Sequence, residues 1–182
     1  ESGGSITQSG NLTIGGTSSF TTSDKTITLN NSSLTNAFSG RVALTTTGSS
    51  AHVYIDNGTT ALEITNGSSV GGNLTLVSGH ASGITDAGSL TVGGNLSATT
   101  DASNGVISLG GLVVEGTIAL ATNDDANNDS ATALVVNNCS ICTGGVGLKF
   151  DTTQVTAGTA QAGASTTVTL AAGASSTDDT YN

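Results

Sequence analysis

The feature that most constrains this chain is internal repetition at two spacings. Residues 5–22 (SITQSGNLTIGGTSSFTT) and 83–100 (GITDAGSLTVGGNLSATT) are identical at ten of eighteen positions, with an offset of 78 residues. A shorter unit, VGGNL at 70–74, recurs 22 residues later at 92–96. Repetition of this kind is typical of a chain that stacks copies of one small structural unit.

Each unit has the same local pattern, a turn followed by a short alternation. Gly, Asn or Asp residues precede apolar residues that alternate with Thr, as in the segments 12–14 (LTI), 27–29 (ITL) and 74–76 (LTL). Alternation with a period of two, bounded by turn residues, predicts short β-strands. The i, i+3, i+4 pattern of an amphipathic helix is missing, so we expect an all-β fold.

Two all-β architectures suit short strands with regular turns. One is an antiparallel β-sandwich or barrel, and the other is a parallel β-helix in which each coil of three strands stacks on the preceding coil. A 22-residue step is a suitable length for one coil, and sandwiches do not normally repeat their sequence. The sequence therefore favours the parallel β-helix, with the antiparallel β-sandwich as the alternative. In the β-helix, Leu74 and Leu96 should occupy one column of inward side chains.

The composition agrees with a narrow interior. Hydrophobic residues make up 35% of the 182 residues and aromatic residues 3%, and Trp, Met and Pro are absent. The core must therefore be built from small and branched side chains. We assign residues 1–151 to a β-helical repeat domain. Residues 152–182 are rich in Ala, Thr and Gly, and we expect them to form a final coil, a linker or a donated strand.

The charge of the chain excludes two classes of partner. The formal net charge is −10, and Lys25, Arg41 and Lys149 are the only basic residues. Nucleic acids and anionic membrane surfaces both attract clustered cations, so we expect neither as a partner. No apolar stretch approaches the roughly 20 residues of a membrane span, so we expect no membrane insertion. An acidic, polar chain of this kind suits a secreted or cell-surface location.

Several segments resemble the repeats of large bacterial exoproteins of the filamentous haemagglutinin type. They are residues 5–17 (SITQSGNLTIGGT), 26–31 (TITLNN), 36–40 (NAFSG) and 70–75 (VGGNLT). The resemblance extends over residues 1 to about 122. It implies a right-handed parallel β-helix, two-partner secretion across the outer membrane, and a role in adhesion or as a surface fibre. We accordingly expect a piece of a longer protein or the processed subunit of a polymer.

Three hypotheses of function follow from these observations. The first is a structural repeat module of a secreted bacterial surface adhesin or extracellular fibre, with other copies, adjoining repeats or a host or neighbouring cell surface as partners. The second is a self-assembling subunit of an extracellular filament, joined head to tail by β-strand pairing. The third is a β-helical polysaccharide-degrading enzyme, which requires a groove with carboxylates, basic residues and aromatic side chains. With so few basic and aromatic residues, we expect no enzymatic activity.

The most distinctive local motif is Cys139-Ser140-Ile141-Cys142. A structural zinc site needs four ligands, and the chain has no second cysteine pair. The following Thr-Gly-Gly does not begin a helix, which a redox motif of this spacing usually does. We therefore predict a disulfide that closes a small surface loop, in an oxidising compartment. Free thiols and a metal or redox site are the alternatives.

An acidic run at residues 123–130 (NDDANNDS) places three carboxylates among side-chain amides. Calcium prefers such oxygen-rich loops, but the glycine and glutamate of an EF-hand are missing. We expect a solvated loop and no required cofactor. If Ca²⁺ binds, Asp124, Asp125 and Asp129 are the candidate ligands.

Other chemistry-bearing residues lie scattered through the repeats. Five carboxylates could be paired by stacking, although no feature of the sequence singles any of them out: Asp56, Glu63, Asp86, Asp101 and Glu115. We expect His52 and His80 to be surface or corner residues without a catalytic role. Asn-x-Ser/Thr sequons are interpreted as turn residues and asparagine ladders, with glycosylation as the alternative; they include Asn11, Asn31, Asn57, Asn66, Asn73, Asn95 and Asn128.

Overall fold

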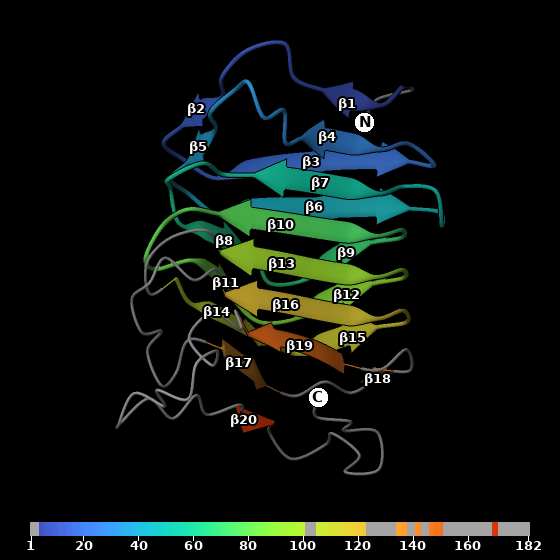
Figure 1. Cartoon of the computed structure of the whole chain (residues 1–182). Helices are drawn as coiled ribbons and strands as arrows, with labels where there is room; N and C mark the ends of the chain where they lie inside the picture. The colour runs from blue at the N-terminus through green and yellow to red at the C-terminus, as the bar shows by residue number, and fades with distance from the viewer. Residues whose placement is uncertain are drawn as a thin grey trace.

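The computed structural model consists of short parallel strands stacked along one axis (Figure 1). It describes residues 4–100 and 105–122, and beyond these the backbone of strands at 134–137, 141–142, 146–150 and 169–170. The chain winds through successive coils as a right-handed parallel β-helix, as the sequence predicts. Every described strand pair is parallel, so the antiparallel β-sandwich is excluded.

One side of the β-helix is a seven-stranded sheet, to which each coil contributes one strand. Its strands are β1 (Ile6–Thr7), β4 (Ile27–Leu29), β7 (Val53–Asp56), β10 (Leu74–Ser78), β13 (Leu96–Thr100), β16 (Ile118–Thr122) and β19 (Val146–Phe150). Consecutive strands of this sheet are joined by the rest of a coil. The sheet therefore records the order in which the coils stack.

An eleven-stranded sheet forms the remaining sides and has two arms. The first arm holds β3 (Ser18–Ser23), β6 (Val42–Thr47), β9 (Ser68–Val70), β12 (Leu90–Val92), β15 (Leu112–Val114) and β18 (Ile141–Cys142). The second arm leaves β6 through β8 (Leu62–Ile64), β11 (Ile84–Asp86), β14 (Ile107–Gly110), β17 (Leu134–Asn137) and β20 (Thr169–Leu170). A separate pair, β2 (Thr13–Ile14) and β5 (Ala37–Phe38), lies near the N-terminal end.

The two arms meet because β6 is longer than the strands that follow it. Val42 at its start lies opposite Ile64 of β8, whereas Thr45 lies opposite Ser69 of β9. The third coil turns between β8 and β9, at Asn66 and its neighbours. In the first two coils, β3 and β6 are each one continuous strand at this position.

Inward side chains form continuous apolar columns, as expected for stacked coils. Leu74 lies directly opposite Leu96. The same column continues on either side, and its members Ile27, Val53, Leu74, Leu96 and Ile118 are each at most 1% exposed. Full burial of one such side chain contributes about 1.5–3 kcal/mol, so the columns supply most of the driving force for stacking.

Glycines allow the coils to approach closely at one corner. The N–H of Gly94 donates to the carbonyl of Gly72 at 3.1 Å, and the N–H of Gly116 donates to the carbonyl of Gly94 at 3.0 Å. A Cβ atom added to Gly116 would lie 2.6 Å from the oxygen of Gly94. Any larger residue would therefore force the coils apart at this corner.

The long repeat does not return to the same side of the β-helix. Between residues 5–22 and residues 83–100, β1 corresponds to β11, β2 to β12, and β3 to β13. The corresponding strands lie in different sheets in all three cases. The 22-residue spacing is therefore one coil, whereas the 78-residue spacing equals three coils and one further strand.

The C-terminal region is described only in part. Within residues 152–182, β20 pairs with β17, and Leu170 lies opposite Val136. No helix that could cross a membrane is found among the described residues.

Candidate functional site

A ladder of side chains runs along the corner before the seven-stranded sheet. The Nδ1 atom of His52 accepts a hydrogen bond from the backbone N–H of Asn73 at 2.9 Å. Asn73 Oδ1 accepts from the N–H of Asn95, and Asn95 Oδ1 accepts from the N–H of Thr117, both at 2.9 Å. Each side chain thus satisfies a backbone donor of the next coil where the strand pairing has not yet begun. His52 plays the same part as an asparagine.

Asparagines form similar contacts at two other corners. Asn66 Oδ1 accepts hydrogen bonds from the backbone N–H and the hydroxyl of Ser89, at 2.8 and 3.0 Å. Asn11 Oδ1 accepts from the N–H of Thr35 at 3.0 Å. The interpretation of the sequon asparagines as ladder residues is therefore confirmed at four of them: Asn11, Asn66, Asn73 and Asn95.

Two further asparagines are buried and join the coils from inside. Asn57 is completely buried, and its Oδ1 accepts from the N–H of Phe38 at 2.7 Å. Its Nδ2 donates to the carbonyl oxygens of Phe38, Thr60 and Ala61 at 2.9–3.2 Å. Asn36, which is 2% exposed, donates in the same way to backbone carbonyls of its own coil and the next. Buried amides with this many partners fix the relative position of neighbouring coils.

One of the two columns of outward side chains on the seven-stranded sheet consists of uncharged residues, of which all but one are small. In register along the axis, it reads Thr28, Tyr54, Thr75, Ser97 and Ala119. Tyr54 is the only large side chain in that part of the column. The second outward column of this sheet reads Asp56, Val77, Thr99 and Ala121. The two columns from β7 to β16 therefore contain one charged side chain, which is not the cluster of charges that an ionic binding site needs.

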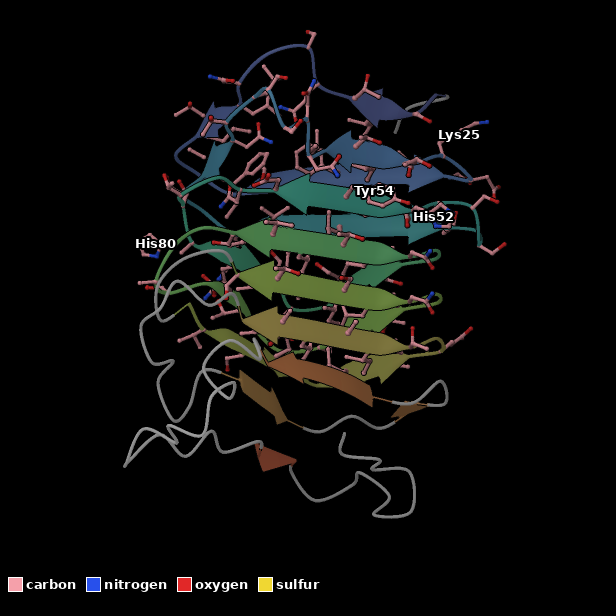
Figure 2. The ribbon with its side chains drawn as sticks, in the orientation of Figure 1. Lys25, His52, Tyr54 and His80 are labelled. Atoms are coloured by element: carbon pink, nitrogen blue, oxygen red, sulfur yellow. The ribbon has the colours of Figure 1, made fainter. Side chains whose placement is uncertain are left out.

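The two histidines lie at opposite ends of the strands (Figure 2). His52 lies at a corner, and its ring centroid is 6.4 Å from that of Tyr54 in an edge-on arrangement. His80 is exposed in a turn, where its Nδ1 accepts from the N–H of Ser82 at 3.0 Å. Both positions agree with the predicted surface or corner locations.

Asp86 differs from the other carboxylates because it points toward the interior. It shares an inward column with Ile64, which is fully buried, and is itself half-buried. Desolvation raises the pKa of Asp86 to about 6, while hydrogen bonds from the N–H groups of Gly110 and Gly88 act in the opposite direction. Both carboxylate oxygens lie 3.0 Å from the nitrogen of Gly110, in the next coil. The sequence did not single out this residue.

The remaining described carboxylates are not brought together. Glu63 forms an exposed ion pair with Arg41, at 2.8 Å between Oε1 and Nε. Asp56 Oδ1 accepts from the N–H of Gly58 in a turn at 2.9 Å. Glu115 is exposed. Among residues 4–100 and 105–122, no three His, Cys, Asp or Glu side chains are grouped so that they could hold a metal ion.

Several predicted sites fall wholly or partly outside the described residues. These are Asp101, the candidate calcium ligands Asp124, Asp125 and Asp129, the sequon at Asn128, and Cys139 of the predicted disulfide. Cys142 lies in β18, where only the backbone is described. The calcium site and the disulfide therefore remain predictions.

Comparison with known proteins gives one match. A family model described as "Repeats of unknown function (DUF5649)" matches residues 1–45. These residues contain β1 to β5 and the start of β6, which form the first two coils. The match spans about a quarter of the chain and agrees with its repetitive character. No curated protein and no solved structure matches the chain.

Proposed function

We propose that this chain is a structural module of a secreted bacterial surface adhesin or extracellular fibre. The observation that carries the proposal is the unbroken register of the coils, from Ile27 through Leu74 to Ile118 in one fully buried column. Backbone hydrogen bonds between coils run along the rod axis. Such a rod holds its length without a bulky core and can carry another part of a protein away from a surface.

The side-chain ladders support the same role. They place hydrogen bonds between coils at corners where the backbone alone would leave donors to solvent, as at Asn73 and Asn95. The buried amide of Asn57 adds a further inter-coil connection. These contacts oppose both bending and slippage of one coil on the next, which are the demands made on a spacer or fibre.

The outer surface suits exposure to the medium outside a cell. Thr, Ser and Ala occupy most of the two outward columns of the seven-stranded sheet, and the chain as a whole has a net charge of −10. Such a surface remains soluble and resists association with other acidic surfaces. Adhesion, in this proposal, depends on contacts made along this polar exterior or by adjoining parts of the protein.

The test is whether the chain is displayed outside the cell. Antibodies raised against the purified chain should label intact cells of the source organism, as seen by immunogold electron microscopy. Labelling should be lost when the gene for the outer-membrane partner of a two-partner secretion system is deleted. A cytosolic marker, which must stay unlabelled in the same cells, controls for lysis. Labelling that requires permeabilised cells would refute the proposed location and with it the function.

A further inference from the structure

One strand of the seven-stranded sheet departs from the pattern of its neighbours. The outward positions of β7 and of the corner before it carry His52, Tyr54 and Asp56, which place an imidazole, a phenol ring and a carboxylate on one face. In the coils that contain β4, β10, β13 and β16, the corresponding positions hold only Thr, Asn, Ser, Val and Ala. Those coils stack without large side chains here, so stacking does not explain the set on β7.

These three side chains, which we call the β7 row, follow one another along the strand. Figure 2 shows His52 and Tyr54 beside each other, and their ring centroids are 6.4 Å apart. Alternate residues of a strand are about 7 Å apart, so the whole row extends over about 13 Å. β7 pairs with β4 on one side and with β10 on the other. The row therefore lies within the sheet and does not depend on either end of the β-helix.

Small neighbours leave the ring of Tyr54 accessible. Thr28 and Thr75 lie directly opposite it in the two adjacent coils. Both side chains are too short to cover an aromatic ring, and Tyr54 is partly exposed. The ring thus offers an apolar surface with a polar tip, which is the combination that makes tyrosine frequent at binding surfaces.

The side chains on either side of Tyr54 are held in place by backbone hydrogen bonds. His52 Nδ1 accepts from the N–H of Asn73 at 2.9 Å, so the neutral ring carries its hydrogen on Nε2, which is left as a donor. Asp56 Oδ1 accepts from the N–H of Gly58 at 2.9 Å, which leaves Oδ2 as an acceptor. Each group is thus oriented through one polar atom and offers the other. Groups that are already ordered lose less conformational entropy when a ligand binds.

The chemistry of the β7 row matches that of a sugar. A pyranose has faces of C–H groups, which pack on an aromatic ring, and a rim of hydroxyl groups, which both donate and accept hydrogen bonds. The row supplies a ring in the middle, a donor at one end and an acceptor at the other. An acidic sugar is disfavoured, because the chain has a net charge of −10 and the row itself contains a carboxylate.

We propose that the β7 row binds a short neutral oligosaccharide, with one sugar ring on Tyr54 and hydroxyl groups bonded to His52 and Asp56. Hydrolysis of a glycosidic bond usually needs two carboxyl groups that flank it. The described outward positions of this sheet from β4 to β16 hold one carboxyl group, so the site binds a glycan without cleaving it. This inference rests on the proposed surface role and names the chemical class of its partner.

Isothermal titration calorimetry of the full chain tests the proposal with the neutral trisaccharides cellotriose, maltotriose, mannotriose and triacetylchitotriose, and with the acidic 3′-sialyllactose. At least one neutral trisaccharide should bind, and 3′-sialyllactose should bind at least about tenfold more weakly. Tyr54→Thr introduces the residue that both adjacent coils have at this position, and should weaken binding at least about tenfold. Ser97→Thr, on the same face two coils away, is the matched control and should leave the Kd unchanged.

A second variant separates loss of binding from loss of folding, which circular dichroism monitors for every variant. His52→Asn keeps a side-chain oxygen for the N–H of Asn73, as Asn73 and Asn95 provide in later coils, but removes the Nε2 donor. It should weaken binding several-fold with an unchanged circular dichroism spectrum. If Tyr54→Thr is misfolded by this criterion, the comparison of His52→Asn with Ser97→Thr decides.

Two results would overturn the inference. If no neutral trisaccharide binds the full chain at concentrations up to about 10 mM, the β7 row is not a sugar site. If folded Tyr54→Thr and His52→Asn both bind as tightly as Ser97→Thr, any sugar binding uses another surface. In either case, labelling of intact cells by the antibody would leave the proposed surface role standing.

Discussion

Replacing Asp86 with asparagine should reveal how a single inward carboxylate makes the stability of this β-helix depend on pH. The folded state raises the pKa of Asp86 from 3.8 to about 6 through desolvation. The carboxyl group therefore holds its proton more tightly when folded than when unfolded. The contribution of Asp86 to the free energy of unfolding is then largest below about pH 4, decreases as the pH rises through about 4 to 6, and stays lower above that range.

The size of the effect follows from the pKa difference. One pKa unit corresponds to about 1.4 kcal/mol, so a shift from 3.8 to about 6 would correspond to roughly 3 kcal/mol for a fully buried group. Asp86 is half-buried, and solvent screening reduces this contribution. We expect the ionised form of Asp86 to lower the free energy of unfolding by about 1–2 kcal/mol at neutral pH. An asparagine at this position would keep one oxygen to accept the N–H of Gly110, without the charge.

Urea unfolding followed by circular dichroism, at about pH 4.5 and about pH 7.5, provides the measurement. Asp86→Asn should raise the free energy of unfolding by about 1–2 kcal/mol at the higher pH and by much less at the lower pH. Asp56→Asn, at an outward position, controls for the general effect of removing one negative charge. The reasoning fails if Asp86→Asn and Asp56→Asn shift stability equally at both pH values, or if Asp86→Asn is destabilising at neutral pH.

Three further predictions concern the contacts between coils, and urea unfolding measures each. Gly93→Ala should lower the free energy of unfolding by about 2 kcal/mol or more, because its Cβ would lie 2.6 Å from a carbonyl oxygen of the preceding coil. The control is Gly15→Ala, at a glycine with open space around it, which should change the free energy of unfolding by less than about 1 kcal/mol. Asn57→Ala should lower the free energy of unfolding by about 3 kcal/mol, since it leaves buried backbone groups without hydrogen-bond partners. Asn31→Ala, in an exposed turn, should lower it far less. Glu63→Gln should change stability by no more than about 1 kcal/mol, because its ion pair is exposed; a larger loss would show that this pair is coupled to the core.

The architecture could be predicted because the length of one coil equals the spacing of a repeat in the sequence. The VGGNL unit recurs after 22 residues, and the structure places Leu74 opposite Leu96 as that spacing requires. The 78-residue repeat predicts the position of a strand on the β-helix less well. Its two copies share a pattern of strands and turns, but their corresponding strands lie on different sides of the β-helix. The length of β6 could not be predicted either. Apolar and polar residues alternate from Val42 to Thr47 as in any strand. The absence in β6 of the turn that separates β8 from β9 depends on the neighbouring coils.

The candidate site was less accessible to sequence reasoning, for two physical reasons. Asn57 has the sequence of an exposed turn, and only the packing of Phe38 beside it makes its amide a buried connection. Asp86 did carry a signal that could have been used. It is the third residue of its strand, and the third residues of the strands stacked on either side are Ile64 and Leu109. Alignment of the coils would therefore have placed a carboxylate in an apolar column.

The displaced copy of residues 5–22 has a consequence for how rods of this type change length during evolution. The same pattern of strands and turns occurs on different sides of the rod. The residues that determine this local structure therefore lie within the segment itself, and their effect does not depend on the side that the segment occupies. Inserting a single strand with its turn would rotate all later residues by one side while leaving the stacking intact. Related genes should therefore differ by gains and losses of such single segments as well as of entire turns.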